Sequence, residues 1–135
     1  MVVVYERRPR QYFTVLLPPV AGPLASGSTD STNTGTVNVV GHEIVTVEVF
    51  FTGVSGATGN VTFYLGESLD GSNFSGDNNV LYSPIQVVCT ANGANTVRNT
   101  AKIDCRGIVA LKLQAVVNNS GGNITNYGVR VGFFR

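Results

Sequence analysis

The chain contains little charge and few of the residue types that usually carry chemistry. Only 13% of its 135 residues are Asp, Glu, Lys or Arg, the formal net charge is +1, and there are one histidine and no tryptophan. A protein that packages nucleic acid normally has a large excess of basic residues, so this composition disfavours that class. A surface made mainly of Asn, Thr, Ser and Gly suits close packing beside other subunits, and it equally suits an ordinary neutral β domain.

Long hydrophobic runs are also missing, and none approaches the length of a membrane span. In residues 1–8 the arginines follow a short apolar run, whereas a secretory signal places basic residues before a longer one. We therefore expect synthesis in a cytoplasm and no membrane partner. A chain of 135 residues fits one domain that buries about two-thirds of its unfolded surface, so it needs neither a metal nor a disulfide to fold.

The two cysteines, Cys89 and Cys105, raise the question of a disulfide. Asn92-Gly93 is a typical two-residue type I′ hairpin turn, and such a turn would set Cys89 opposite Thr96. Cys105 would then lie almost a full strand length away, beyond the roughly 7 Å between Cα atoms that a disulfide allows. The sequence therefore predicts two reduced and mostly buried thiols.

Candidate catalytic and metal-binding residues are scarce. His42 is the only histidine, it precedes Glu43 at the head of an expected strand, and no nucleophile-elbow sequence accompanies it. One histidine and two distant cysteines do not match the ligand spacing of a zinc site. We expect His42 to be a surface residue, and we expect neither enzymatic activity nor a cofactor.

Asp70, Asp77 and the asparagines near them form the densest group of oxygen donors, and calcium takes such ligands. Their spacing does not match an EF-hand loop, which needs alternating donors and a terminal bidentate glutamate. Asp-Gly and Asn-rich sequences are typical of plain turns, which is the interpretation we favour. Asp104 and Arg106, beside an expected strand end, are interpreted as a surface ion pair or as an anchor for a loop or subunit contact.

Residues 1–35 differ in composition from the rest of the chain. Residues 2–5 and 11–17 have the apolar content of strands, but an Arg-Arg-Pro-Arg segment separates them and prolines follow the second. Residues 25–35 are polar and show no period. The sequence therefore predicts an N-terminal arm and a flexible polar loop up to residue 35, followed by a β-sandwich domain over residues 36–135.

From residue 36 onward, apolar and polar residues alternate with the period of a half-buried strand. In residues 42–52 the odd positions from 45 are apolar, and a one-residue slip would turn that whole face to water. Gly- and Asn-rich connections such as residues 53–60 are typical of hairpins. The positions predicted to face the core are Val45, Val47, Val49, Phe51, Val61, Phe63, Leu65, Ile85, Val87, Cys89, Val97, Ala101, Ile103, Val109, Leu111, Leu113, Ala115, Val117, Tyr127, Val129, Val131 and Phe133.

Together these segments give about eight strands, at the spacing of roughly 8 to 12 residues that is typical of a sandwich or barrel. No window of comparable length has helical periodicity. The predicted fold class is all-β, an antiparallel β-sandwich of about eight strands with an N-terminal arm. The strand order stays open between a jelly roll and an immunoglobulin-like sandwich.

Arg7, Arg8 and Arg10, flanked by Tyr5 and Tyr12, form the one cluster of charge in the sequence. Arginines with aromatic neighbours can grip phosphates and stack on bases. The net charge of +1 and the lack of a basic stripe along the strands argue against nucleic acid as the partner. We favour a terminal arm that binds a neighbouring subunit through the bidentate hydrogen bonds of its guanidinium groups.

Residues 61–74 read Val-Thr-Phe-Tyr-Leu-Gly-Glu-Ser-Leu-Asp-Gly-Ser-Asn-Phe. This run resembles a pattern of small structural proteins of tailed bacteriophages, in which a strand ends in a Ser-Leu-Asp-Gly-x-Asn-Phe turn within a β-sandwich. Residues 103–113, together with the alternating strand that follows Asn118, are similar to the second half of the same kind of domain. The similarity covers roughly residues 42–134 and leaves the arm unmatched.

The resemblance implies a virion component without enzymatic activity: a capsid decoration protein, or a head-completion or tail protein. Decoration proteins are often homotrimers that sit on the major capsid protein, with terminal arms reaching neighbouring subunits. We therefore expect a homotrimer in the virion, with exposed aromatics such as Tyr64 and Tyr82 packed against sister subunits and the arm along the shell. Removal of residues 1–17 is then expected to abolish attachment and to leave the fold intact.

Two alternatives stay open. The chain would also suit a phage tail, fibre or neck component, or a carbohydrate-binding module. In a sugar-binding site Tyr64 and Tyr82 would stack on the C–H face of a sugar ring, while the amides of Asn78 and Asn79 would bond its hydroxyls. Tryptophan, a strong platform for such stacking, is absent.

Overall fold

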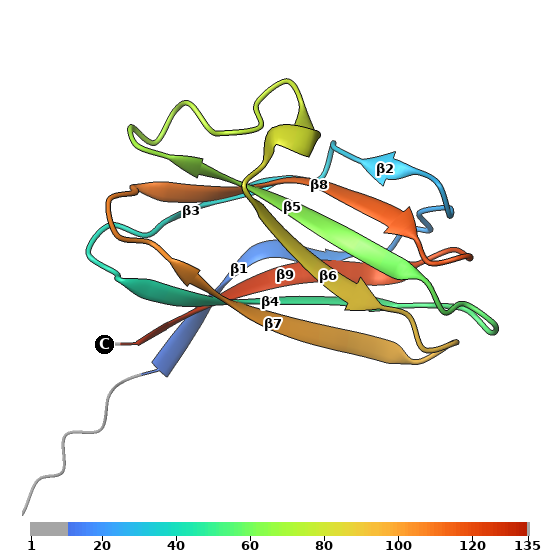
Figure 1. The fold of residues 1–135 in the computed structure, drawn as a ribbon. Coiled ribbons are helices and arrows are strands. Elements are labelled where there is room, and N and C mark those ends of the chain that lie inside the picture. The colour runs from blue at the N-terminus through green and yellow to red at the C-terminus, as the bar shows by residue number, and fades with distance from the viewer. Residues whose placement is uncertain (1–10, 135) are drawn as a thin grey trace, which may run out of the picture.

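The computed structural model describes residues 11–134, which form a sandwich of two antiparallel β-sheets (Figure 1). The strands are β1 (Gln11–Val20), β2 (Thr29–Asp30), β3 (Gly35–Asn38), β4 (Ile44–Thr52), β5 (Asn60–Ser68), β6 (Ile85–Thr90), β7 (Thr96–Asp104), β8 (Ala110–Asn119) and β9 (Thr125–Phe134). A short 3-10 helix, η1 (Val80–Tyr82), lies between β5 and β6. The first sheet has the order β1-β9-β4-β7, and the second has the order β2-β8-β5-β6, with β3 also paired to β8. The predicted antiparallel sandwich is confirmed.

The strand pairs are nested in the manner of a jelly roll. β1 pairs with β9, β2 and β3 pair with β8, β4 pairs with β7, and β5 pairs with β6, all antiparallel. The chain is thus one long antiparallel hairpin with its tip at the β5–β6 connection, rolled up so that successive pairs alternate between the two sheets. Of the two strand orders that the sequence left open, the pairing is that of the jelly roll.

The core lies between the two sheets and is built from the alternating positions of the long strands. The inward faces predicted for β4, β5 and β9 are confirmed, because every apolar residue predicted there is at most 3% exposed. Each buried side chain of valine to phenylalanine size contributes about 1.5–3 kcal/mol relative to an exposed one. A slip of register by one residue would lose that contribution along a whole strand, which is why the alternation specifies the pairing so firmly.

Two connections that were predicted to be hairpins instead cross from one sheet to the other. Residues 53–60 lead from β4 in the first sheet to β5 in the second, and residues 91–95 lead from β6 in the second sheet to β7 in the first. Both hairpin predictions are therefore wrong. The turn chemistry is local, whereas the choice of pairing partner depends on which strands bury their faces together, and this choice favoured pairs that are distant in the sequence.

A β-bulge in β8 changes the side-chain alternation that the sequence predicted. Leu113 pairs with Leu65 and Ala115 pairs with Tyr64, so Gln114 is an extra residue on the β8 side. Beyond the bulge the phase is reversed, and Val116 joins the core cluster in place of the predicted Ala115 and Val117. The same bulge buries the side chain of Gln114, which was predicted to point outward.

The predicted division at residue 35 runs through the sandwich. Residues 11–20 form β1, which pairs with β9 along its length and buries Leu16 and Leu17 in the core. The polar segment that follows is also built into the fold, since Thr29–Asp30 and Gly35–Asn38 pair with β8. Deleting residues 1–17 would remove most of β1, so the expectation that the fold survives this truncation is contradicted by the pairing.

Asp30 holds the polar segment against β9. Its carboxylate accepts hydrogen bonds from the hydroxyl of Tyr127 at 2.5 Å and from the backbone N–H groups of Thr32 and Asn33, each at 3.0 Å. Burial alone would raise the pKa of Asp30, but the hydrogen bonds from Tyr127, Asn33 and Thr32 outweigh burial and lower it. Burial and the contact with Asp30 raise the pKa of Tyr127, so both groups keep their ordinary charge states at neutral pH.

Cys89 and Cys105 are both free and buried. The prediction of two buried thiols is confirmed, although the hairpin on which it was based does not exist, because Cys89 belongs to β6 and Cys105 follows β7 in the other sheet. Burial raises the pKa of both thiols, that of Cys105 to about 11, so neither is a thiolate at neutral pH. In the described part of the chain no helix is long and apolar enough to cross a membrane.

Candidate interaction surfaces

Of the residues singled out in the sequence as subunit or capsid contacts, the structure describes the side chains of Tyr64 and Tyr82. Tyr5, Arg7, Arg8 and Arg10 lie outside the described residues. The backbone of Tyr12 lies in β1, where it pairs with Phe133 in the first sheet, and its side chain lies outside the description.

The two other aromatic candidates lie in strand β5 and in the connection that follows it. Tyr64 is half-buried in the middle of β5, where it pairs with Gln86, while Tyr82 is 76% exposed in η1. Of the aromatic residues predicted to make contacts, Tyr82 is thus the one whose described side chain is free to reach a partner.

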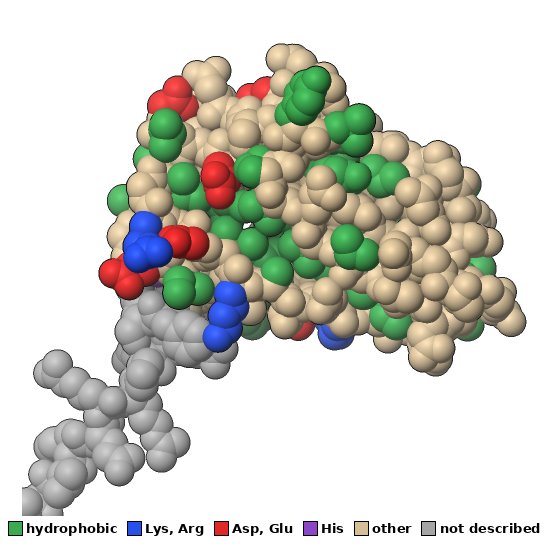
Figure 2. All heavy atoms as spheres, viewed as in Figure 1, with side chains coloured by type: hydrophobic (Ala, Val, Ile, Leu, Met, Phe, Trp, Pro, Cys, Tyr) green, Lys and Arg blue, Asp and Glu red, His purple; other side chains and the backbone are tan. Residues whose placement is uncertain are grey.

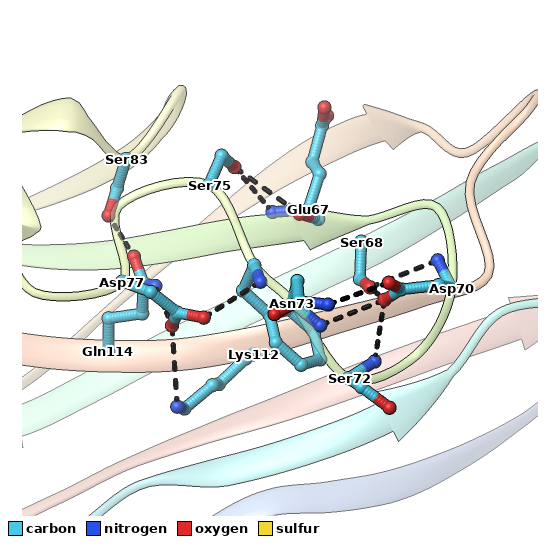
Figure 3. Close-up of polar contacts among 11 residues, drawn as sticks. Glu67, Ser68, Asp70, Ser72, Asn73, Ser75, Asp77, Ser83, Lys112 and Gln114 are labelled. Carbon is cyan, nitrogen blue, oxygen red and sulfur yellow. Dashed lines mark hydrogen bonds and ion pairs between the residues drawn. The ribbon is translucent and has the colours of Figure 1, made fainter.

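The first half of the β5–β6 connection is an aspartate turn (Figure 3). The carboxylate of Asp70 accepts hydrogen bonds from the backbone N–H groups of Ser72 and Asn73, both at 2.8 Å, from the Asn73 amide and from the Ser68 hydroxyl. The hydrogen bonds from Asn73, then those from Ser72 and Ser68, hold the pKa of Asp70 far below its usual range. Because both oxygens already accept bonds from the turn, the geometry agrees with a plain turn rather than a calcium loop.

The second half of the connection is fastened to β8 through the bulged Gln114 (Figure 3). Its side-chain oxygen accepts a hydrogen bond from the Ser83 hydroxyl, and its amide donates one to Asp77 at 3.2 Å. Asp77 also accepts from the backbone N–H of Phe74 at 2.9 Å and pairs with Lys112 at 3.6 Å. The N–H of Phe74, against a smaller opposing effect of burial, and the charge of Lys112 lower the pKa of Asp77.

The β5–β6 connection, whose backbone these hydrogen bonds hold in place, also carries exposed apolar side chains. Leu69, Leu81 and Tyr82 are 78%, 69% and 76% exposed, respectively. Beside Leu69, a hollow of about 600 Å³ is lined mainly by apolar groups, including those of Phe74 and Ile108. We call the surface formed by Glu67, Leu69, Asp70, Asp77, Leu81, Tyr82 and Lys112 the loop surface.

A second exposed surface is the outer face of the sheet β1-β9-β4-β7. Strand pairing places its residues in rows that run across the sheet: Phe13, Gly132, Thr46 and Lys102 in one row, and Val15, Arg130, Glu48 and Thr100 in the next. Residues opposite each other in an antiparallel sheet project from the same face, so each row is a line of neighbouring side chains. We call the surface formed by Phe13, Val15, Glu48, Arg98, Lys102 and Arg130 the sheet face.

Charged and aromatic side chains are interlocked on the sheet face. Glu48 lies between two arginines, accepting hydrogen bonds from Arg98 Nη1 at 3.1 Å and from Arg130 Nε at 2.9 Å. The guanidinium carbon of Arg130 lies 5.2 Å from the centroid of the Phe13 ring, and that of Arg98 lies 4.8 Å from the centroid of Phe50. Cation–π contacts at such distances, combined with the shared carboxylate, restrict the orientation of both arginines.

The two surfaces carry opposite net charge. The sheet face has three cations, Arg98, Lys102 and Arg130, against one carboxylate, which gives +2. The loop surface has three carboxylates against one lysine, which gives −2. In the view of Figure 2, Lys and Arg side chains appear only on the lower part of the molecule, where Asp and Glu side chains lie among them, whereas the charged side chains at the top are all Asp or Glu.

The remaining charged and titratable residues make simple surface contacts. Arg106 and Asp104 form an ion pair with 2.7 Å between Nη2 and Oδ2, as the sequence suggested. His42 packs against Phe133, with 4.6 Å between the ring centroids. Within residues 11–134, no three His, Cys, Asp or Glu side chains come together in a group that could hold a metal ion.

The sheet face was not predicted from the sequence. Its charged residues, at positions 48, 98, 102 and 130, are single outward polar residues distributed over three strands, β4, β7 and β9. Only the register of β9, β4 and β7 brings Glu48 into contact with Arg98 and Arg130. The local signal that does exist is the outward placement of Arg130 and Glu48, and it does not reveal that they are partners.

Comparisons with known proteins give a likeness of fold. No protein-family model and no curated protein matches the chain in sequence. A structure of the infectious bursal disease virus Gx strain matches 95% of this chain with a TM-score of 0.53 and 13% identity, and the VP2 subviral particle of the same virus matches 94% with a TM-score of 0.53 and 12% identity. The Gt strain matches 94% with a TM-score of 0.52 and 20% identity. The chain spans only 32–33% of the length of these viral chains.

Proposed function

We propose that the chain is a non-enzymatic structural protein of a virus, which decorates and stabilises a phage capsid through contacts with the shell and with sister copies. The observation that carries the proposal is the extent of the match, since the jelly roll of this chain corresponds over 94% of its length to one part of a VP2 chain that forms a subviral particle. A fold by itself hosts many functions, so the surfaces must supply the rest of the argument.

The surfaces favour a role based on contacts. Exposed apolar side chains such as Phe13, Leu69 and Tyr82 stand beside charged groups whose positions are held by hydrogen bonds. Such patches suit packing against other proteins. On a symmetric shell, many copies with individually weak contacts add by multivalency, so a nearly neutral domain can stabilise the particle without one strong binding site.

The copy number of the chain in virus particles tests the proposal. Particles purified from the culture that produces the protein would be labelled with gold-tagged antibodies, and the chain would be counted against the major capsid protein by quantitative mass spectrometry. We expect label over the heads and hundreds of copies per particle. Label confined to tails, or a few dozen copies, would support the tail or neck alternative, and particles without the chain would contradict a structural role.

The arm is tested by a shorter truncation than the sequence suggested. Because β1 begins at Gln11, deleting residues 1–10 leaves all nine strands in place. We expect the truncated protein to keep its melting temperature and to lose attachment to particles that lack the native chain. The matched control replaces Arg7, Arg8 and Arg10 by glutamine in the full chain, which removes the charge of the arm and keeps its length. Attachment that is unchanged in both variants would exclude the arm as the anchor.

A carbohydrate-binding module is the second candidate, and the exposure of Tyr82 is the observation that favours it. The side-chain oxygen of Asn79 is already used, because it accepts a hydrogen bond from the backbone N–H of Leu81 at 3.1 Å. Only part of the amide group predicted to bind sugar hydroxyls is therefore available. A glycan array probed with the wild type and with Tyr82→Ala would decide, since binding that is lost in the variant would favour this candidate.

A further inference from the structure

Exposed apolar side chains are concentrated on the two surfaces defined above. Among the described residues, nine large hydrophobic side chains are exposed, and five of them belong either to the sheet face or to the loop surface. Phe13 and Val15 are 61% and 48% exposed on the sheet face, and Leu69, Leu81 and Tyr82 are at least 69% exposed on the loop surface. Patches of this kind, bordered by charged groups, are typical of sites that bind proteins.

The charges decide which surfaces can meet. Two sheet faces packed together would place +2 against +2, and two loop surfaces would place −2 against −2. Like charges brought together at an interface are unfavourable, whereas the sheet face of one copy and the loop surface of another are complementary. The charge pattern therefore favours a contact between two different surfaces over a symmetric contact of one surface with itself.

The fold places the two surfaces so that one copy can use both at once. The sheet face is the outer side of the sheet β1-β9-β4-β7, while the loop surface belongs to the β5–β6 connection of the opposite sheet (Figure 1). A contact between unlike surfaces leaves one of each kind free at the ends of the assembly. It therefore adds copies until the assembly closes into a ring or continues as a chain.

We propose that copies of the chain bind one another head to tail, with the sheet face of one copy seated on the loop surface of the next. Phe13 and Val15 pack against Leu69 and the adjoining apolar hollow, and Arg130, which lies against Phe13, faces the carboxylates of the loop together with Arg98. The arginines are already oriented by Glu48 and by the aromatic rings, so binding orders few further side chains. This inference deepens the proposed function, on which it rests for the setting in which copies meet, and it names the surfaces of contact.

The association of the isolated full chain tests the inference. Sedimentation velocity over a wide range of concentration is expected to give species larger than a dimer at low salt, with association weakened at least tenfold by high salt because the contact includes exposed charge pairs. Phe13→Ser on the sheet face and a Leu69→Ser/Leu81→Ser double variant on the loop surface are each expected to be monomeric. Val40→Ser is the matched control, because Val40 is 59% exposed and belongs to neither surface.

Mixing the two variants distinguishes a contact between the two unlike surfaces from a contact of one surface with itself. The Phe13→Ser protein keeps an intact loop surface, and the double variant keeps an intact sheet face, so the mixture has one competent contact and is expected to form a one-to-one heterodimer that grows no further. Native mass spectrometry with one partner isotope-labelled would detect it. Circular dichroism and melting temperature would establish that each variant is folded, as expected for exposed positions.

Three results would overturn the inference: a wild-type chain that stays monomeric at every concentration, a single-surface variant that still self-associates, or a variant mixture that forms no heterodimer. None of them bears on whether the chain is found in virus particles. Conversely, a chain that is absent from particles but assembles head to tail in solution would contradict the proposed function and leave the contact established. The two proposals can therefore fail separately.

Discussion

The loop surface and the sheet face are made in different ways. In the loop surface, the hydrogen bonds of Asp70 all go to Ser68, Ser72 and Asn73, within three residues of it in the sequence. On the sheet face, Glu48 bonds to arginines that lie 50 and 82 residues away. A turn built from near neighbours forms wherever its sequence occurs, whereas a face built across four strands exists only when the whole register is correct.

One part of the loop is held by a residue that is distant in the sequence, and that residue lies at the bulge in β8. Gln114 fastens the second half of the loop from 31 and 37 residues away, through Ser83 and Asp77. The loop surface is thus held by the local turn at Asp70 and by a long-range clamp, which consists of Gln114 and its partners Ser83 and Asp77. Substitutions in the turn, in the clamp and on the sheet face should therefore lower the free energy of unfolding by different amounts. These losses should also depend differently on salt and pH.

The largest effect is expected at the clamp from Gly76→Ala. Gly76 has a φ of +86°, and a Cβ atom there would lie 2.3 Å from Gln114 Oε1 and 2.4 Å from Ser83 Oγ. We expect a loss of about 2–3 kcal/mol in the free energy of unfolding, measured by urea denaturation. Gly27→Ala is the matched control, because Gly27 has a φ of +82° and nothing within 4 Å of the added atom. The control should lose only about 1–2 kcal/mol of left-handed strain, and equal losses would mean that the clamp does not constrain the loop.

The next effect is expected from Gln114→Leu, which keeps the size of the side chain and removes its hydrogen bonds. The hydroxyl of Ser83, in a residue only 4% exposed, would lose its partner. Leaving such a group unsatisfied costs about 1–3 kcal/mol, and urea denaturation would measure it. Gln86→Leu on the exposed side of β6 is the control and should change stability little. A Gln114 variant as stable as this control would show that the bulge, rather than its side chain, positions the loop.

A smaller effect is expected on the sheet face from Glu48→Gln. The substitution removes the charge shared by Arg98 and Arg130, whose side chains are 51% and 37% exposed. Exposed ion pairs contribute about 0–1 kcal/mol, so the loss should be of that order and should shrink as salt is added. Glu43→Gln, at an exposed position outside this face, is the comparison. A loss well above that range, or one independent of salt, would mean that the face is held by packing rather than by charge.

The smallest effect is expected from acid acting on the aspartate turn. The folded pKa of Asp70 is depressed below its ordinary value of 3.8. Its stabilising contribution is therefore complete above pH 3.8 and is lost only as the pH falls towards the folded pKa. The amide NMR signals of Ser72 and Asn73 should stay unchanged down to about pH 3.8 and move below it. Asp70→Asn should lack this late acid transition, and movement of the signals above pH 4 in the wild type would contradict the assignment.

What could be predicted from the sequence follows the same distinction between local and long-range contacts. The inward faces of β4, β5 and β9 and the turn at Asp70 were predicted correctly, because alternation and turn chemistry are properties of neighbouring residues. The hairpins at residues 53–60 and 91–95 were wrong, because a turn sequence does not say which strand becomes the partner. The sheet face was missed for the same reason.

Two further features of the fold, the bulge in β8 and the place of the N-terminal residues, were not predicted, and each has a physical cause that the sequence does not show. The bulge at Gln114 reversed the alternation in β8, and nothing in the run Leu113-Gln114-Ala115 marks an extra residue, since both phases bury apolar side chains. The assignment of residues 1–35 to an arm and loop recognised the strand-like content of residues 11–17 but placed it outside the sandwich, and it gave Asp30 no role, because proline and polar residues suggest irregular structure. In the fold, β1 lies on the edge of its sheet, where prolines are tolerated.

The sequence by itself determined that this chain is an all-β protein whose long strands each bury one face. The reason is that the alternation of apolar and polar residues, which specifies such a face, involves only residues close together in the sequence. The tertiary structure alone decided that these strands nest as a jelly roll, that the chain from residue 11 belongs to the sandwich, and that separate charged residues meet as one positive face opposite a negative loop. Those outcomes depend on pairing between residues as distant in the sequence as Gln11 and Phe134, which is set by the joint burial of two sheets and by no single segment.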